Sequence, residues 1–302
     1  MSTINEQTAA NVNAWRQRGE MLRLNNHSIF VVDEGDITLP VIVLIHGFPT
    51  SSYDWQPVWA TLSKNYRLIC LDMLGFGFSD KPNKRNYTIH KQADLVEALI
   101  KQKSLGDFHL LAHDYGDTVA QELLARQNEG QGEGNLLSAC FLNGGLFPET
   151  HHALLTQKLL LSPVGRYINA LAGFSTFKKN FSSVFGPNTK PSEQELQAFW
   201  SIINTNNGKH VFHNCITYMR DRIQHRERWV KALQAPICPL GLINGSVDPI
   251  SGAHMVARYK ALNCQLDYFA ALDDIGHYPQ VEAPEPVAEH ALRFIETSVA
   301  DS

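Results

Sequence analysis

The chain has 302 residues, 44% of them hydrophobic and 19% charged, and a formal net charge of −4 at pH 7. This length suits one sheet-centred domain that carries an insertion and can bury a large core. Residues of both charges are mixed along the sequence, which excludes the basic field that nucleic-acid binding requires. The densest basic cluster alternates with acidic residues and is predicted to be the solvated face of a helix: Arg220, Arg222, Arg226 and Arg228.

The cysteine pattern and the hydropathy predict the cellular compartment of the protein. The five cysteines lie far apart and include no C-x-x-C pair, which predicts buried free thiols in a reducing compartment. Neither a signal-peptide pattern nor an apolar run of about 18 residues is present. We therefore expect a soluble cytoplasmic protein without a membrane span.

The first hundred residues alternate apolar runs with polar segments. Residues 1–12 are polar and are predicted to be mobile, and the first strand is predicted at Ser28–Val32. Pro40–Ile45 and Tyr66–Met73 are apolar runs typical of strands buried on both faces. Apolar residues at helical spacing predict a helix over Thr88–Lys103.

The segment Phe108–Gln121 predicts a strand that turns sharply into a helix. Small residues, Ala112 and Gly116, lie two positions before and after Asp114, so a compressed turn can lift that side chain above the sheet. Such a nucleophile elbow usually carries serine. An aspartate there predicts that Asp114 attacks carbon and forms a covalent ester.

The second half of the chain predicts an insertion between strands. A strand is predicted at Leu136–Leu142, and the strand–helix alternation stops near Phe147 and returns at Ile237–Asn244. Four helices are predicted in between: Ala153–Leu161, Arg166–Phe174, Glu193–Ile203 and His210–Ile223. A helix at Gly252–Leu262, a strand at Gln265–Ala270 and a final helix at Pro286–Val299 complete the pattern. We expect an α/β fold with a mostly parallel sheet flanked by helices, a core of residues 1–146 and 233–302, and a helical cap of residues 147–232.

Two further residues complete a predicted catalytic triad with Asp114. Asp248 follows a strand in GSVDP, and His277 follows the last strand in GHYPQ. The order nucleophile, acid, histidine is that of α/β-hydrolases, and all three residues fall where parallel strands end. His277 is predicted to activate water while Asp248 orients its ring.

Other acids are alternatives to Asp248. Asp273 and Asp274 are closer to His277 in sequence, and Asn143 follows the sixth strand but is an amide, which cannot serve as the carboxylate.

The backbone amides of Phe48 and Tyr115 are placed to form an oxyanion hole, because the residue after the nucleophile and the loop after the third strand supply these donors. His46 is predicted to have a structural role in that loop.

Several motifs together resemble one branch of a known superfamily. They are HGFP at 46–49, DMLGFGFSDKP at 72–82, HDYG at 113–116, GSVDP and GHYPQ at 276–280. This set resembles the epoxide hydrolase and haloalkane dehalogenase branch of the α/β-hydrolase superfamily. Longer stretches, HGFPTSSYDW, NGGLFPETH and VFGPNTKPSE, are similar to the mesoderm-specific transcript (MEST-like) family. The resemblance implies an α/β-hydrolase fold with a helical cap and no metal or organic cofactor.

Epoxide hydrolysis and haloalkane dehalogenation, the two activities of this branch, differ in the side chains that must assist the leaving group. An epoxide gains from a phenol that protonates its oxygen, whereas a halide needs N–H donors such as indoles. Tyr218 resembles the cap tyrosine of epoxide hydrolases, with Tyr167 as a poorer second candidate. Tyr115 and Phe48 stand where dehalogenases of this branch have tryptophan and asparagine, which disfavours a halide.

The expected function is hydrolysis of a small apolar epoxide to a vicinal diol. Haloalkane dehalogenation, ester hydrolysis by the same site, and a catalytically idle interaction protein are the alternatives.

Overall fold

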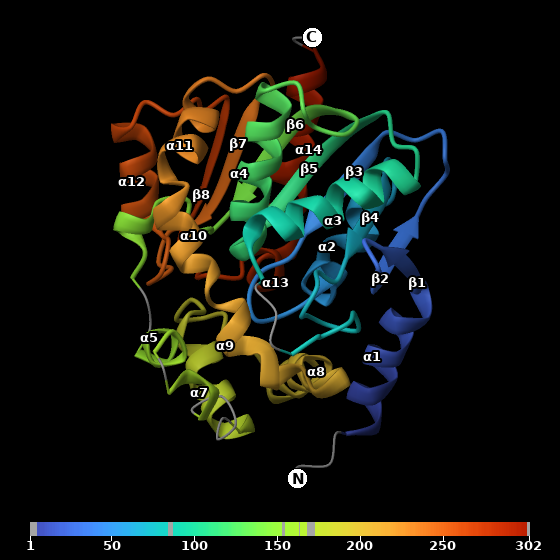
Figure 1. The fold of residues 1–302 in the computed structure, drawn as a ribbon, viewed down its shortest axis with the longest axis vertical. Helices are drawn as coiled ribbons and strands as arrows, with labels where there is room; N and C mark the ends of the chain where they lie inside the picture. Colours follow the sequence, from blue (N-terminus) through green and yellow to red (C-terminus); the bar gives the residue numbers. More distant parts are fainter. Residues whose placement is uncertain (1–4, 84–86, 153–154, 163, 168–172, 301–302) are drawn as a thin grey trace.

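The fold is built on an eight-stranded sheet. The computed structural model describes residues 5–83, 87–152, 155–162, 164–167 and 173–300. The strand order is β1-β2-β4-β3-β5-β6-β7-β8 (Figure 1). The strands are β1 (Gly19–Leu24), β2 (His27–Glu34), β3 (Val41–Ile45), β4 (Arg67–Leu71), β5 (Asp107–His113), β6 (Asn135–Leu142), β7 (Leu240–Gly245) and β8 (Tyr268–Leu272).

The sheet is parallel from β4 to β8 and antiparallel only where β2 meets β1 and β4. Every residue of β3 and β7 is buried, as expected for strands covered on both faces. The predicted mostly parallel sheet is therefore confirmed. The additional strand β1 was not predicted. It joins β2 through Asn25 and Asn26, which adopt left-handed φ values of 45° and 67°, as residues of tight hairpin turns do.

The prediction of a mobile N-terminal segment is wrong for the described residues. Residues from Glu6 to Arg18 form helix α1, and the side chain of Asn5 accepts a hydrogen bond from the backbone N–H of Gln7 at its start. Trp15 is buried and packs edge-on against Trp59 at 5.1 Å between ring centroids. Burial of this one large ring anchors a helix whose other residues are mostly polar.

Helices cover both faces of the sheet (Figure 1). One face packs against α1, α2 (Gln56–Leu62) and α14 (Pro284–Ala300). The other face packs against α3 (Ile89–Gln102), α4 (Tyr115–Asn128), α11 (Arg226–Gln234) and α12 (Ala253–Ala261). The short elements η1 (Ser52–Trp55) and α13 (Pro279–Glu282) lie in the loops after β3 and β8.

A mostly helical segment separates β6 from β7, as predicted. Its described elements are η2 (Pro148–Thr150), α5 (Leu155–Leu160), α7 (Phe174–Ser183), α8 (Glu193–Asn204), η3 (Thr205–Val211), α9 (Phe212–Cys215), α10 (Tyr218–Gln224) and α11. Helices α5, α7, α8 and α9 gather at one end of the molecule, in the lower part of Figure 1.

Details of this insertion differ from the prediction. The single helix expected at His210–Ile223 is divided into η3, α9 and α10. The hydroxyl of Thr217 donates to the carbonyl of Asn214 at 2.7 Å in the interruption, where a side chain competes for the helical backbone acceptor. Helix α7 was not predicted, and α11 was expected only through the basic cluster that includes Arg226 and Arg228. Most of the helix expected at Arg166–Phe174 lies outside the described residues. The boundary expected at residue 232 falls inside α11, which packs against α4, so the division into core and cap stays a prediction.

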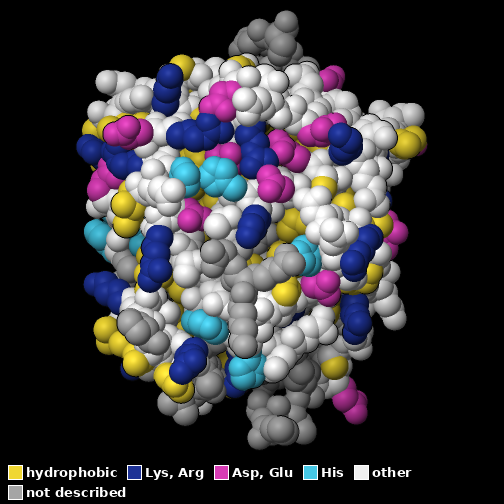
Figure 2. All heavy atoms as spheres, viewed as in Figure 1, with side chains coloured by type: hydrophobic (Ala, Val, Ile, Leu, Met, Phe, Trp, Pro, Cys, Tyr) yellow, Lys and Arg dark blue, Asp and Glu magenta, His cyan; other side chains and the backbone are white. Residues whose placement is uncertain are grey.

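The surface and the thiols show two further features. All five cysteines are buried and free. Lys and Arg side chains are interspersed with Asp and Glu over the helices in the upper part of Figure 2, without one continuous basic field on that face. Among the described residues, no helix is both long and apolar enough to cross a membrane.

Candidate active site

Asp114 occupies the sharp corner between β5 and α4. Its backbone has φ 49° and ψ −104°, in a region that residues with a side chain rarely adopt. Gly116 is required two residues later, because a Cβ atom there would lie 2.4 Å from the carbonyl oxygen of Ile45. The chain thus turns tightly against β3 and presents the Asp114 side chain at the carboxyl end of β5.

His277 connects Asp114 with Asp248. Its Nε2 atom lies 3.7 Å from Oδ1 of Asp114, and its Nδ1 atom lies 2.8 Å from Oδ2 of Asp248. The three side chains come from the ends of β5, β7 and β8, and all are less than 5% exposed. The fold therefore brings together the three residues that the sequence analysis selected.

Asp248 is held by neighbours that fix its orientation. Its Oδ2 atom accepts hydrogen bonds from Nδ2 of Asn143 at 3.0 Å and from the hydroxyl of Ser251 at 2.8 Å, and its Oδ1 atom accepts one from the Ile250 amide at 2.7 Å. Asn143 therefore lies next to the acid and supports it. Asp273 and Asp274, the alternatives to Asp248, are exposed.

One of the two expected backbone donors contacts Asp114 directly. The amide of Phe48 donates to Oδ2 of Asp114 at 3.0 Å. Tyr115 is the first residue of α4, where helical N–H groups have no acceptor within the helix. His46 is fully buried between the carbonyl of Gly47 and the amide of Met73, so it shapes this loop.

Charge interactions in the site shift the pKa values of His277 and Asp114 in opposite directions. Burial lowers the pKa of His277, but the charges of Asp248 and Asp114 outweigh this effect and raise the pKa to about 9. Burial raises the pKa of Asp114, but the charges of His277 and Arg222 outweigh it and hold the pKa below its ordinary value. The pair is therefore an ionised carboxylate beside an imidazolium at neutral pH.

The two tyrosines predicted to assist the leaving group lie in different environments. Tyr218, at the start of α10, is fully buried, its ring packs at 4.7 Å from that of Tyr115, and its side chain also interacts with Arg222. Tyr167 is 56% exposed, and the guanidinium of Arg166 lies 4.5 Å above its ring. The fold brings Tyr218 to the site, whereas the contacts of Tyr167 are on the surface.

Arg222 is the site residue that the sequence analysis missed. It was predicted to lie on a solvated helix face, but it is only 2% exposed, and its Nη2 atom lies 4.0 Å from Oδ1 of Asp114. The signal that predicts this position is its spacing from Tyr218, because residues four apart share one face of a helix. Arg220 on the same helix is exposed, and Arg226 and Arg228 pair with acids at the surface of α11, as expected for that cluster.

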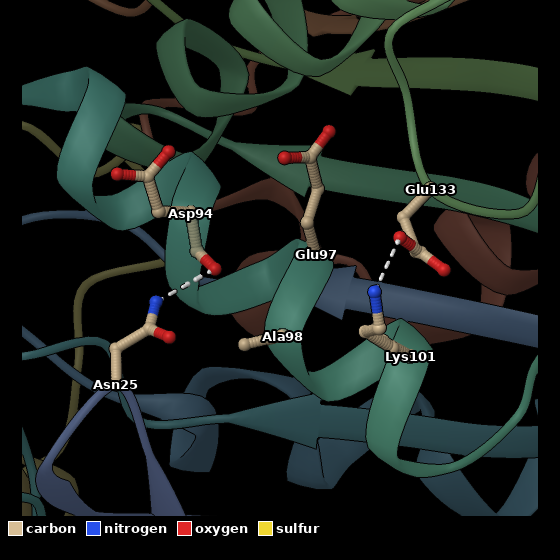
Figure 3. A pocket seen from close by; sticks show the side chains of 6 residues that line it. All are labelled: Asn25, Asp94, Glu97, Ala98, Lys101 and Glu133. Atoms are coloured by element: carbon tan, nitrogen blue, oxygen red, sulfur yellow. Dashed lines mark hydrogen bonds and ion pairs between the residues drawn. The ribbon is translucent and has the colours of Figure 1, made fainter.

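A second feature, a surface hollow of about 550 Å³, lies away from this cluster (Figure 3). It is lined by Asn25, Asp94, Glu97, Ala98, Lys101 and Glu133. Lys101 and Glu133 lie near the chain segments that enter β5 and β6, at the edge of the sheet opposite to Asp114. In the described part of the chain, no three or more His, Cys, Asp or Glu side chains are arranged so that they could hold a metal ion.

Comparison with known proteins relates this geometry to a family. The model of the α/β-hydrolase fold family matches residues 40–284. The mesoderm-specific transcript homolog protein of Bos taurus is 41% identical over 296 residues, which cover 94% of this chain and 88% of that protein. LipZ of Mycobacterium tuberculosis is 35% identical over 288 residues, covering 95% and 99% of the two chains.

A solved structure supports the fold independently. The haloalkane dehalogenase DbeA from Bradyrhizobium elkani superimposes with a TM-score of 0.79 at 22% identity, over 94% of this chain and 99% of that one. The strand order, the elbow and these matches lead to one assignment. The chain belongs to the α/β-hydrolase fold family and, within it, is a relative of the mesoderm-specific transcript proteins.

Proposed function

We propose that the protein hydrolyses an epoxide to a vicinal diol through a covalent ester on Asp114. The observation that carries this proposal is the His277 ring, which faces Asp114 with Nε2 at 3.7 Å and Asp248 with Nδ1 at 2.8 Å. An oriented imidazole next to a carboxylate at an elbow is the arrangement that a two-step ester mechanism requires.

In the first step, an oxygen of Asp114 attacks a ring carbon of the epoxide. The carbon–oxygen bond of the ring breaks, and the released alkoxide takes the proton of the Tyr218 hydroxyl. The protonated His277 returns a proton to the tyrosinate, directly or through water. The products of this step are a neutral hydroxyalkyl ester on Asp114, neutral Tyr218 and neutral His277.

The pKa of His277 explains why the second step follows. Burial lowers this pKa, and the charges of Asp248 and Asp114 together raise it to about 9. Ester formation removes the charge of Asp114, so the pKa of His277 falls and its free base becomes available. Nε2 then takes a proton from water, and the resulting hydroxide attacks the ester carbonyl.

The backbone then stabilises the charge that develops on the ester. The Phe48 amide, which donates to Oδ2 of Asp114 at 3.0 Å, faces the oxygen that becomes negative, and the Tyr115 amide is the second donor in this proposal. The ester carbon–oxygen bond breaks, and the diol leaves with the proton from His277. The Asp114 carboxyl, which now holds one oxygen from water, then gives its proton to His277, which restores the carboxylate and the imidazolium.

A single turnover in heavy-oxygen water tests the covalent route. Enzyme in excess over 1,2-epoxybutane should incorporate one labelled oxygen into the peptide that contains Asp114, measured by mass spectrometry after proteolysis. Label found only in the diol, with none in Asp114, would show direct attack by water and overturn the proposal.

Carbon–halogen cleavage would use the same ester but a different leaving group. The rings that pack around Tyr218 are those of Phe48 and Tyr115 rather than indoles, which favours the epoxide. Release of bromide from 1-bromobutane at a rate equal to or above that of epoxide opening would favour dehalogenation instead.

A further inference from the structure

The Arg222 guanidinium reaches the candidate site from the inserted segment. It lies on α10 four residues after Tyr218, stacks over that ring at 4.5 Å, and is 2% exposed. Gly145 makes room for it, because a Cβ atom there would lie 2.4 Å from Nη1. A buried arginine normally pairs with a carboxylate, since leaving its charge without compensation is costly.

The contacts of Arg222 leave part of its hydrogen-bonding capacity unused. Nε donates to the hydroxyl of Thr118 at 2.8 Å, and Nη2 donates to the carbonyl oxygen of Asp114 at 3.3 Å. Nη1 has a long contact of 3.5 Å to Nδ1 of His151. The distance of 4.0 Å to Oδ1 of Asp114 exceeds the roughly 2.8 Å of a charge-assisted hydrogen bond. The guanidinium therefore makes no bidentate bond to Asp114.

His151 lies beside Arg222 and faces the same guanidinium. Burial and the charge of Arg222 lower the pKa of His151 to about 3, so its ring is neutral at neutral pH. With Nδ1 facing the Arg222 donor as an acceptor, Nε2 carries the hydrogen. That Nε2 atom is buried, and the side chain of Gln157 also lies within hydrogen-bonding reach of the ring. A neutral histidine and an arginine thus present N–H groups at the same place.

The proposed reaction also changes the charges that surround Arg222. Asp114 and Asp248 balance His277 and Arg222 in the free site. Burial, together with the charge of Asp114, raises the pKa of the neighbouring Asp117 well above its ordinary value. Esterification neutralises Asp114, whose Oδ1 atom lies 4.0 Å from Arg222, and the proton transfer of the first step neutralises His277. A substrate carboxylate would then replace Asp114 as the anion beside the guanidinium.

We propose that the substrate carries a carboxylate, which Arg222 and His151 bind beside the carbon that Asp114 attacks. This inference rests on the proposed function and names its substrate class. The carboxylate oxygen would lie about 2.8 Å from the guanidinium, and the reacting carbon about 3–3.5 Å from the Asp114 oxygen. Since Nη2 and Oδ1 are 4.0 Å apart, the carboxylate is adjacent to the reacting ring, as in a short 2,3-epoxy acid.

The kinetic test compares oxirane-2-carboxylate with glycidol, its neutral alcohol analogue. The wild-type protein should show a kcat/KM ratio of about 100 in favour of the acid, and Arg222→Gln should reduce that ratio to about 1. Arg222→Lys keeps the charge and should retain an intermediate ratio. Arg220→Gln, an exposed arginine of the same helix, is the matched control and should keep the wild-type ratio.

A wild-type preference for glycidol would overturn the inference without any variant. An Arg222→Gln protein that loses activity equally on both epoxides would also overturn it, because Arg222 would then only position Asp114.

Binding of unreactive probes separates this inference from the proposed function. Propanoate should bind the wild-type protein in calorimetry and propanamide should not, and Arg222→Gln should abolish propanoate binding. Asp114→Asn removes the competing carboxylate and should tighten propanoate binding about 10-fold or more.

The two failures are distinguishable. Propanoate binding without turnover of any epoxide would sink the proposed function and keep the carboxylate site. Epoxide turnover without propanoate binding would keep the function and reject the carboxylate site.

Discussion

The ends of the central strands and the inserted helices contribute to the site in different ways. The strands that carry Asp114, Asp248 and His277 belong to a ladder whose middle members are almost entirely buried. The inserted segment leaves apolar side chains exposed, including Leu155, Leu159, Val164 and Tyr167. The central sheet thus fixes the positions of the reacting groups, and the inserted segment supplies Tyr218 and Arg222, which contact the substrate in our proposals.

The two regions meet at the loop that carries His277. A separate apolar cluster joins Phe181, Val184 and Phe185 of the insertion to Ile250 and Tyr278 of the strand-end loops. The ring of Phe185 stacks on Tyr278 at 5.3 Å, and the His277 amide donates to the carbonyl of Val184 at 2.9 Å. The insertion therefore also contacts and holds the loop that carries the proposed base. Because the two regions supply different groups in the proposed mechanism, we expect variants in each region to affect different steps of the reaction.

The largest effect is expected for the strand-end nucleophile. Asp114→Asn should lower kcat on 1,2-epoxybutane by about 10⁴-fold, because an amide cannot form the ester. Initial rates of diol formation measure this loss. Undetectable turnover by the wild-type protein under every condition, with Asp114→Asn indistinguishable from it, would indicate instead an idle member of the fold that acts through partners.

His277→Gln should separate the two steps within the same region. Ester formation should proceed while its hydrolysis slows by about 10³-fold, because no base activates water. Intact-protein mass spectrometry should detect one stable substrate adduct per chain, mapped to Asp114. Rapid turnover without an adduct would exclude His277 as the base.

Tyr218→Phe tests the contribution of the inserted segment. Removing the phenol should slow epoxide opening by about 100-fold, because the alkoxide loses its proton donor. Tyr167→Phe is the matched control and should leave the rate unchanged, since that side chain is 56% exposed. Pre-steady-state formation of the ester measures the opening step. Equal rates of ester formation for the wild type and Tyr218→Phe would show that Tyr218 is not the proton donor and that only residues at the strand ends take part in the reaction.

The smallest expected effect concerns the coupling of His277 to Asp248. Asp248→Asn should lower the pKa of His277 from about 9 by roughly one unit or more, because the nearest negative charge is lost. Histidine NMR titration of the two proteins measures the shift.

Stability gives a second readout with a defined sign. The raised pKa of His277 stabilises the folded protein below the ordinary histidine value of 6.5, and this contribution is lost as pH rises through about 9. The stability advantage of the wild type over Asp248→Asn should therefore shrink between these two pH values in urea unfolding. An advantage that grows over this range would contradict the assigned charge state.

Local sequence signals predicted the sheet and the triad because each depends on a short stretch of chain. Continuous apolar runs specify strands buried on both faces, and the small residues around Asp114 allow the corner that Gly116 closes. Helix α1 was missed because its stability comes from Trp15 packing on Trp59, a contact between residues 44 positions apart. The interruption after α9 was missed because a side-chain hydrogen bond, from the hydroxyl of Thr217 to the carbonyl of Asn214, competes there with the helical backbone.

The sequence by itself determined the fold class and placed Asp114, His277 and a choice of acids near the strand ends, because parallel strands must end at one edge and the motifs follow those ends directly. Only the tertiary structure decided that Asp248 rather than Asp273 or Asp274 faces His277, and that Arg222 is buried beside Asp114 rather than solvated. Both outcomes depend on how the inserted helices and the strand-end loops pack against each other. A charge pattern along one helix carries no information about what covers its opposite face.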